Sequence, residues 1–268
     1  MIKLGKFMKL VQNENMKIYR RIRTWIMLGF IIGLPILISV GKLLTSDSNT
    51  TSSWGMMHIE SVFSFILIII FTVVIASETV AGEFTWGTIK LLLIRPWSRS
   101  AILLSKYIST MLFALFLTVI AFAVTYLINF ALFGSSQAGE ILGGFGGLSN
   151  GEFMLKFYLF QFISLIIIVT FGFMMSSAFR SSGLAIGLSI SLLFAGSIVT
   201  GILASSDKKW VEYVLFMHLD LTTYINNPKG SISNHPMSLG FSLAVLAGYF
   251  ILFNAISWTV FKKRDVAA

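Results

Sequence analysis

Residues 65–76 read FILIIIFTVVIA, a stretch of strongly apolar residues without a charge. Its residues do not alternate between polar and apolar, whereas the strands of a membrane β-barrel alternate with a period of two. The uncharged run around it extends over 17 residues, from Ser61 to Ser77. A helix needs about 20 mostly apolar residues to cross a bilayer, and it satisfies its own backbone hydrogen bonds there. This stretch therefore predicts a membrane-spanning helix.

Five further uncharged runs have lengths that suit the same role. They are Thr24–Gly41, Tyr107–Gly139, Phe157–Phe179, Ser181–Ser206 and Gly230–Phe261. The sequence thus predicts an all-α membrane protein with six transmembrane helices in a single domain over residues 1–268. We expect the spans at about 24–44, 58–77, 104–133, 154–179, 182–204 and 238–261. Pro35 lies inside the first span and is expected to kink it.

The composition agrees with a membrane protein. Hydrophobic residues make up 56% of the chain and charged residues 12%, and the mean hydropathy is +0.86. A soluble domain carries about 25% charged residues, so an ordinary soluble enzyme, a disordered protein and a coiled coil are excluded. Cysteine is absent, and His58, His218 and His235 have no metal-ligand spacing. We therefore expect no metal site and no catalytic residues.

The Lys and Arg residues indicate the orientation of the chain. If the N-terminus lies in the cytoplasm, six spans place 15 of them on the inner side and 5 on the outer side. The positive-inside rule then predicts that both termini are cytoplasmic. The basic residues flank membrane spans, so we expect a lipid bilayer and no nucleic acid as partner. The expected location is the plasma membrane.

The predicted spans themselves show no Asp, Glu, Lys or Arg at depth. Intramembrane charges usually mark ion or proton pathways, so this pattern argues against a proton-driven carrier. Polar side chains in the spans either tie helices together or touch a substrate. The candidates for a substrate path are Thr125, Asn129, Gln161 and Asn254.

Two segments outside the spans are expected to form short helices. In residues 1–23, Leu4, Phe7, Met8, Val11 and Ile18 recur near helical spacing among Lys and Arg residues, which predicts an amphipathic helix in the inner membrane interface. A plain basic flank is the alternative. The outer loop 205–237 contains a stretch over 210–224 that favours a short outer helix, with Trp210, Val214, Leu215 and Met217 on its buried face.

The inner loop after the second span is the most patterned segment. Residues 76–107 read ASETVAGEFTWGTIKLLLIRPWSRSAILLSKY. Phe84–Ile94 predicts a short helix that ends before Pro96, and Ser98 is suited to cap the following helix. Glu83 has Lys90 and Arg95 nearby in sequence as ion-pair partners. The Gly82–Gly87 spacing imitates a phosphate-binding loop, but Thr88 occupies the position of the lysine, so we expect no ATP site.

This loop resembles the ABC-2 type permeases, which are membrane subunits of bacterial ATP-binding cassette exporters. Their pattern has a glutamate, a glycine with Thr-Ile or Thr-Leu, leucines, Pro-x-Ser-Arg and a lysine. The corresponding residues here are Glu78, Glu83, Gly87, Thr88, Ile89, Leu92, Leu93, Pro96, Ser98, Arg99 and Lys106. The motif covers about 30 residues, and the six-span layout extends the resemblance over the chain.

The resemblance implies that the loop 78–103 is a coupling helix that docks on a separate ATPase. It assigns this coupling to Glu78, Glu83, Gly87, Thr88, Leu92, Pro96 and Arg99. The chain itself would need no cofactor, because ATP and Mg²⁺ would be bound by the cytoplasmic partner. A second permease chain, identical or homologous, would complete the unit. Glu78 as a helix cap and Arg99 as a positive-inside charge are the structural alternatives.

The expected function is efflux of an amphipathic or hydrophobic substrate, such as a peptide antibiotic, a toxin or a drug, in a Gram-positive bacterium. One alternative is an immunity or sensor protein in the membrane that transports nothing. The other, within the same family, is a sodium efflux permease.

Overall fold

The described part of the computed structural model comprises residues 4–45, 52–90, 97–134, 148–206, 208–227 and 236–263. Six helices in it are long and apolar enough to cross a membrane, with mean hydropathies between 2.0 and 2.7. They are α2 (Ile22–Thr45), α3 (Ser53–Thr79), α6 (Arg99–Phe133), α7 (Asn150–Ala178), α8 (Ser182–Leu203) and α10 (Leu239–Lys263). The prediction of an all-α protein with six such helices is confirmed.

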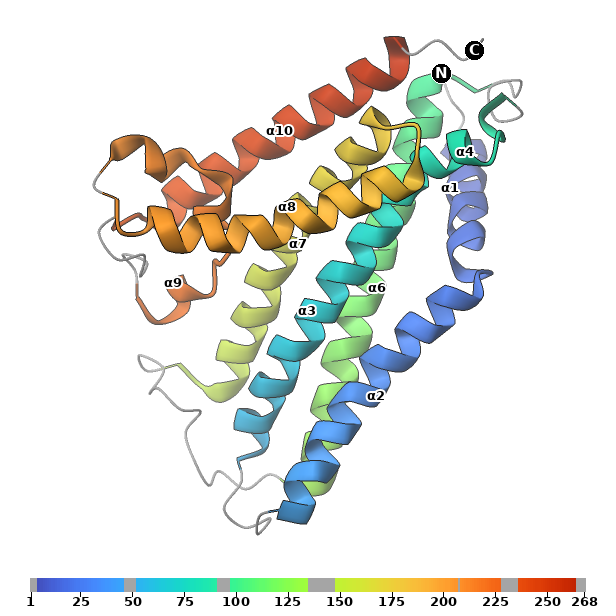
Figure 1. Ribbon diagram of the computed structural model, residues 1–268. Helices are drawn as coiled ribbons and strands as arrows, with labels where there is room; N and C mark the ends of the chain where they lie inside the picture. Colours follow the sequence, from blue (N-terminus) through green and yellow to red (C-terminus); the bar gives the residue numbers. More distant parts are fainter. Residues whose placement is uncertain are drawn as a thin grey trace.

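Helix α3 is the centre of the bundle. It packs against α2, α6, α7 and α8. Helices α2, α3, α6 and α7 run along one another, whereas α8 and α10 are inclined to them (Figure 1). Helix α1 (Leu4–Tyr19), the short α4 (Ala81–Thr85) and the last turn of α10 lie at one end of the molecule, which we call the terminal end (Figure 1). The other end of α2, α3 and α6 is called the opposite end.

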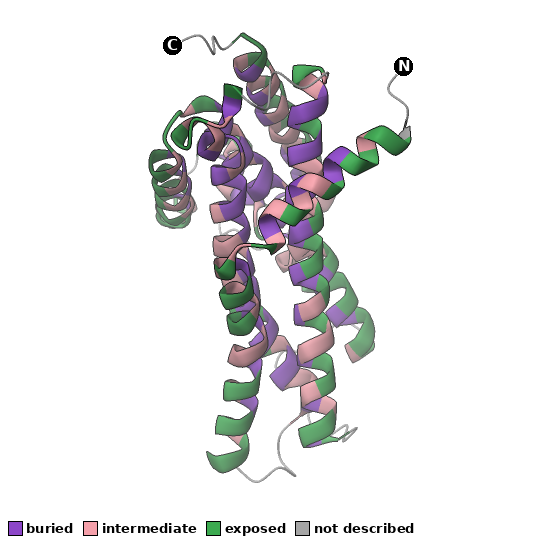
Figure 2. Ribbon diagram, turned by 90° about the vertical axis from the view of Figure 1, so that its right-hand side faces the viewer, coloured by how far each residue is buried: buried purple, intermediate pink, exposed green. Residues whose placement is uncertain are grey.

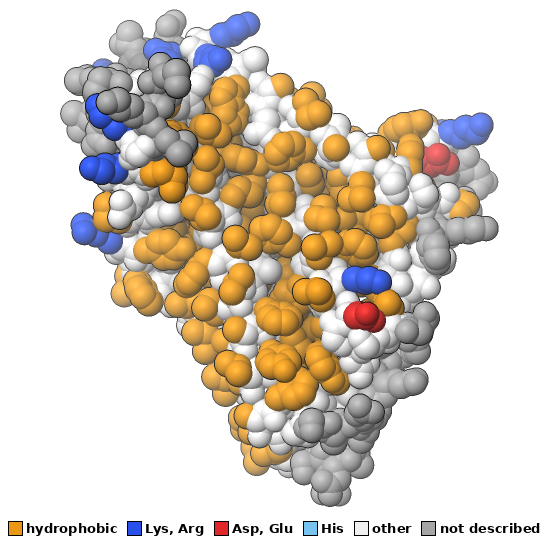
Figure 3. All heavy atoms as spheres, turned by 180° about the vertical axis from the view of Figure 1, so that it is seen from behind, with side chains coloured by type: hydrophobic (Ala, Val, Ile, Leu, Met, Phe, Trp, Pro, Cys, Tyr) orange, Lys and Arg blue, Asp and Glu red, His pale blue; other side chains and the backbone are white. Residues whose placement is uncertain are grey.

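The core lies between α3, α6 and α7. It contains Phe65 and Ile68 of α3, Phe113 and Leu117 of α6, and Leu165 of α7, each at most 2% exposed. Buried residues follow the inward faces of these helices (Figure 2). Large apolar side chains also cover the outside, and one broad face of the molecule is mainly hydrophobic (Figure 3). A surface of this kind suits contact with lipid chains.

Serine side chains cap the N-termini of five long helices. Ser52, Ser98, Ser149, Ser181 and Ser238 each accept a hydrogen bond from a backbone N–H in the first turn of α3, α6, α7, α8 and α10. At α7 the Glu152 carboxylate also accepts from the Ser149 N–H, which completes a capping box. The predicted cap at Ser98 is confirmed.

Helix α1 packs against α6, and the face that it buries there is not purely apolar. Its buried residues are Leu10, Val11, Glu14 and Ile18, whereas Met8 is exposed. The expected helix is present, but its buried face differs from the expected one because it includes a carboxylate. That carboxylate has partners in α6, as described below.

The prediction of a continuous helix over Phe84–Ile94 is wrong in its first part, where a turn interrupts the helix. Helix α4 ends at Thr85, and Gly87 has a φ of +67°, which only glycine adopts readily. Ile89 and Lys90 are helical again. Leu92 and Pro96 of the predicted coupling set lie outside the described residues. Gly87 thus turns the chain between two short helical segments.

The segment between α8 and α10 holds two 3₁₀ turns, η2 (Lys209–Tyr213) and η3 (Leu215–His218), and one short helix, α9 (Thr223–Asn226). Met217 is buried as expected, but Trp210 is 55% exposed and Val211 is buried in its place. The tighter 3₁₀ winding shifts which side chains face inward. Phe216 of η3 packs directly on Gly196 of α8.

Gly196→Ala is expected to lower the free energy of unfolding by about 1–3 kcal/mol, because a small-to-large change at a packed site forces neighbours to move. A methyl group at Gly196 would lie 2.1 Å from a ring carbon of Phe216. Gly187 on the same helix has no atom within 4 Å of such a methyl group. Gly187→Ala is therefore the matched control and should leave the thermal midpoint in detergent unchanged or slightly raised. Equal midpoints for the two variants would contradict the packing of Phe216 on α8.

Candidate functional site

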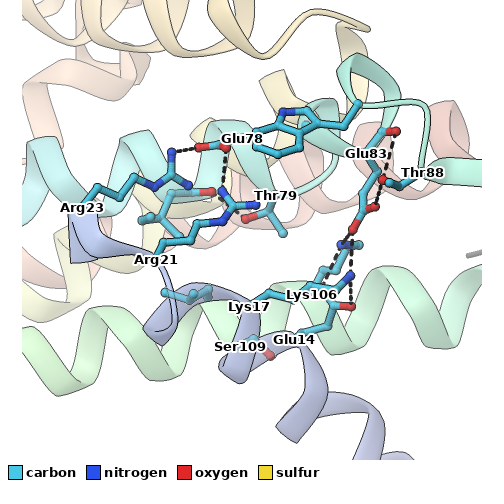
Figure 4. A pocket seen from close by; sticks show the side chains of 14 residues that line it. Glu14, Lys17, Arg21, Arg23, Glu78, Thr79, Glu83, Thr88, Lys106 and Ser109 are labelled. Carbon is cyan, nitrogen blue, oxygen red and sulfur yellow. Dashed lines mark hydrogen bonds and ion pairs between the residues drawn. The ribbon is translucent and has the colours of Figure 1, made fainter. Parts of the chain in front are cut away.

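A charged cavity of about 340 Å³ opens at the terminal end, between α1, α3, α4 and α6 (Figure 4). Four basic and three acidic side chains face it. Its lining consists of Glu14, Lys17, Ile18, Arg21, Arg23, Ile75, Glu78, Thr79, Gly82, Glu83, Trp86, Thr88, Lys106 and Ser109. Residues far apart in the sequence thus meet in one place.

Four of these side chains form a closed ring of ion pairs, which we call the ionic ring: Glu14, Lys17, Glu83 and Lys106. The Lys106 Nζ atom lies 2.8 Å from Glu14 Oε2 and 2.8 Å from Glu83 Oε1. The Lys17 Nζ atom lies 2.9 Å from Glu14 Oε1 and 2.9 Å from Glu83 Oε1. The ring joins α1, α4 and α6. Because Lys106 is only 2% exposed, it depends on these carboxylates for compensation of its charge.

A second ionic group lies next to the ring. Arg21 Nη1 donates to Glu78 Oε1 at 2.6 Å, and Arg23 pairs with the other oxygen of Glu78. The Arg21 guanidinium also stacks over the Trp86 ring, 5.6 Å from its centroid. This group fastens the start of α2 to the end of α3.

The ionic ring shifts the pKa values of Glu14, Lys17 and Glu83. Burial alone would raise the pKa of Glu83, but the Lys106 ammonium and hydrogen bonds from Lys106, Thr88 and Lys17 lower it to about 2. Burial also opposes ionisation of Glu14, and Lys106 and Lys17 bring its pKa below the usual value. The pKa of Lys17 is raised, since Glu14 and Glu83 outweigh its burial. Glu14, Lys17 and Glu83 are therefore ionised at neutral pH.

The structure brings together most of the residues proposed for coupling that it describes. Glu78, Glu83 and Thr88 line the cavity, and the Thr88 hydroxyl donates to the Glu83 carboxylate. Gly87 lies beside them at the turn. Arg99 lies elsewhere, because its guanidinium donates to the Lys262 carbonyl oxygen of α10 at 3.0 Å.

The expected partners of Glu83 were wrong in part. Lys90 is exposed and makes no ion pair with Glu83, and Arg95 lies outside the described residues. Lys17 and Lys106 are the partners instead. Sequence reasoning missed Glu14 and Lys17 as site residues, although Glu14 on the apolar face of an amphipathic helix is a readable signal.

The four candidates for a substrate path separate into three places. Thr125 and Asn129 are fully buried in α6, and the Asn129 side chain donates to the Thr125 carbonyl oxygen at 2.8 Å. Gln161 is half-buried on α7. Asn254 lies on α10 and donates to the carbonyl oxygen of Phe250 at 2.9 Å. Both of these contacts lie within one helix, and Asn129 also donates to Glu60 of α3.

Two charged residues near the ends of the predicted spans are buried inside the bundle, although the uncharged runs themselves hold none. Glu60 is fully buried within α3, and Lys106 is buried within α6. The cause is helix length. Helix α3 begins at Ser53 and α6 at Arg99, so both helices extend well beyond the uncharged runs that mark them in the sequence. Glu60 lies beside Asn129 and Ser39.

Six long apolar helices packed around a hydrophobic core define a multi-pass membrane protein. The chain belongs to the DUF2705 family, whose model matches residues 28–267 and is described as a protein of unknown function. The matched region contains five of the six long helices in full and most of α2. It begins after α1, so the two α1 members of the ionic ring lie outside it.

Two relatives from Bacillus subtilis (strain 168) cover most of the chain. The uncharacterized protein YhcI is 38% identical over 233 residues, which are 84% of this chain and 72% of YhcI. The uncharacterized membrane protein YdbK is 30% identical over 203 residues, which are 75% of this chain and 78% of YdbK. The name of YdbK agrees with the membrane assignment made from the helices.

Proposed function

We propose that this chain is the permease subunit of an ABC-2 type exporter. A separate cytoplasmic ATPase would bind and hydrolyse ATP with Mg²⁺, and two permease chains would form the pathway. The cargo would be an amphipathic or hydrophobic molecule. We place the protein in the cell membrane with both termini in the cytoplasm, because Lys and Arg residues gather at the terminal end.

The observation that carries this proposal is the convergence at the terminal end. One cavity is lined by four residues that the resemblance selects, namely Glu78, Glu83, Thr88 and Lys106. The first and the last of them, Glu78 and Lys106, are 28 positions apart in the chain. Helix α4 follows α3 directly and is joined to α1 and α6 through Glu83. A force on α4 would therefore reach three helices, which a coupling element requires.

The buried charges and the exposed turn have different roles in this proposal. Glu83 and Lys106 hold α4 in place, so they are poor candidates for direct contact with a partner. The residues available at the surface are in the turn after α4, where Thr85, Trp86, Gly87 and Lys90 are exposed. Trp86 is 68% exposed. An exposed tryptophan of this kind is a frequent anchor in protein interfaces.

The test is to purify the tagged chain from native membranes in mild detergent and identify the proteins that accompany it. We expect an ATP-binding cassette protein at equal stoichiometry with the chain. Trp86→Ala should reduce its recovery at least tenfold, which corresponds to about 1.4 kcal/mol of binding. Trp210→Ala is the matched control, because Trp210 is also exposed but lies in η2, at the far end of α8.

Other outcomes would support the alternatives. If no ATPase accompanies the chain in several mild detergents, the exporter proposal fails, and a stand-alone immunity or sensor protein takes its place. If an ATPase is present and vesicles with the complex move sodium ions but no amphipathic substrate, the chain is a sodium efflux permease. A second permease in the same eluate distinguishes a heterodimer from a homodimer.

A further inference from the structure

Glu60 occupies an unusual place for a carboxyl group. It lies seven residues after the start of α3, which is roughly 10 Å along the helix axis from the opposite end. Its exposed fraction is 0%. Helices α2, α3 and α6 converge at this end (Figure 1), and they contribute Ser39, Glu60 and Asn129 respectively.

These three side chains form a closed cycle of contacts, which we call the Glu60 cycle. Asn129 Nδ2 donates to Glu60 Oε2 at 2.5 Å and to the Thr125 carbonyl oxygen at 2.8 Å. Ser39 Oγ contacts Glu60 Oε1, and it also lies 3.4 Å from Asn129 Oδ1. The Asn129 amide is held in this orientation by Thr125, because a turned amide would place its oxygen against the Thr125 carbonyl oxygen, which can only accept.

A protonated Glu60 supplies a hydrogen for each contact of the cycle, whereas an ionised Glu60 leaves the 3.4 Å contact between Ser39 Oγ and Asn129 Oδ1 without one. The two N–H groups of Asn129 are both used, one on Glu60 and one on Thr125. The two oxygen–oxygen contacts of Ser39 then have a single hydroxyl hydrogen between them. If Glu60 is protonated, its O–H donates to Ser39 Oγ, and the Ser39 hydroxyl donates to Asn129 Oδ1. Every contact of the cycle is then satisfied.

The surroundings of Glu60 also favour a neutral acid. Throughout the described ranges, no Lys, Arg or His lies within ion-pair distance of Glu60. The packed elements carry four titratable groups close to it in sequence or through a shared contact. Tyr158 of α7 bonds Ser61 through its hydroxyl, and His58 of α3 packs on Phe153 and Phe157. Tyr126 of α6 lies one turn from Asn129, and Lys42 of α2 lies one turn from Ser39. Burying an ionised carboxylate without a cation costs far more free energy than burying the neutral acid.

We infer that Glu60 is a proton-binding site within the membrane-spanning bundle and carries one proton while α2, α3 and α6 are packed together. Three helices contribute to the cycle, so it exists only in this arrangement. Helix α2 is the least buried of the three, since 17% of its apolar window is buried, against 33% for α6 and 50% for α3. It also contains Pro35, which removes a helix hydrogen bond one turn from Ser39. A movement of α2 would open the cycle and let the proton pass to entering water, leaving a carboxylate.

Infrared difference spectroscopy of the purified protein tests this inference directly. The carbonyl stretch of a protonated carboxylic acid lies apart from both carboxylate bands. The spectrum of the native chain minus that of Glu60→Gln at pH 7 should show one carboxylic acid band and no carboxylate bands. The corresponding difference for Glu152→Gln, an exposed acid on α7, should show carboxylate bands instead.

The thermal midpoint of Glu60→Gln shows whether this variant folds like the native chain. Glutamine can make the same contacts as a protonated glutamate, so Glu60→Gln should keep the thermal midpoint within about 2 °C of the native value. Carboxylate bands for Glu60 at pH 7 would overturn the inference. So would a carboxylic acid band that sodium or potassium chloride removes at constant pH, because the site would then bind a metal cation. A large drop in the midpoint of Glu60→Gln would also overturn it, since the carboxylate charge would then stabilise the fold.

Discussion

Lys106→Met is expected to lower the free energy of unfolding by about 3–5 kcal/mol, the cost of breaking a buried ion pair on one side. Methionine has nearly the length of lysine, so little packing is lost. The change leaves Glu14 and Glu83 with Lys17 as their only partner in the ionic ring. Two buried carboxylates would then share one half-exposed ammonium. The thermal midpoint of the purified protein in detergent is the measurement.

Lys90→Met is the matched control, because Lys90 is an exposed lysine on the segment between α4 and α6. Its midpoint should remain near the native value. The double variant Lys106→Met/Glu83→Gln restores the charge balance, since Glu14 and Lys17 remain as a pair, and should recover part of the loss. If the single and double variants are equally destabilised, the ring does not act as a unit. If Lys106→Met has the same thermal midpoint as Lys90→Met, Lys106 is not buried in an ion pair.

Acidification is expected to remove about 3 kcal/mol of stabilisation that ionised Glu83 supplies. The folded chain lowers the pKa of this carboxyl group from 4.5 to about 2, and each unit corresponds to about 1.4 kcal/mol. A lowered pKa means that the unfolded chain binds the proton more readily. The stabilisation is therefore complete above pH 4.5 and is lost as the pH falls from 4.5 through 2.

The comparison of the native chain with Glu83→Gln isolates this contribution. At pH 7 the variant should be less stable, and the difference between the two midpoints should close as the pH falls from 4.5 towards 2. Carboxyl groups outside the ionic ring titrate in the same range, but they are present in both proteins and cancel in the difference. A difference that stays constant from pH 7 to pH 2 would show that the Glu83 charge does not contribute.

Both results bear on the proposed coupling. Because Glu83 and Lys106 stabilise the fold, loss of partner binding in variants of these residues would not distinguish a docking contact from a damaged terminal end. The exposed Trp86 permits that distinction, since its side chain is 68% exposed and is not a member of the ionic ring. A Trp86→Ala chain with a native midpoint and no ATPase would separate docking from folding.

Much of the fold was readable in the sequence. The uncharged runs located all six long helices, because the length of an apolar segment decides whether it can cross a bilayer. The cap at Ser98 was readable because a serine before a helix satisfies a free N–H group locally. The break at Gly87 was not foreseen, since a glycine within a short apolar segment is compatible with either a helix or a turn.

The candidate site could be predicted only in outline. The resemblance selected Glu78, Glu83 and Thr88, which do meet at one cavity. It gave no sign of Glu14 or Lys17, which lie more than 60 positions before Glu83 in the chain. Nearness in sequence suggested Lys90 as the partner of Glu83, but the packing of α1 on α6 placed Lys17 and Lys106 there instead.

The sequence by itself determined that this is a membrane protein with six spanning helices, because partition into a bilayer depends on the apolar content of each segment alone. Only the tertiary structure decided how its charges are compensated. It closed the ionic ring at the terminal end and buried Glu60 between three helices at the opposite end. The reason is physical: the cost of a buried charge depends on the groups within a few ångströms of it, and helix packing brings those groups together from distant parts of the chain.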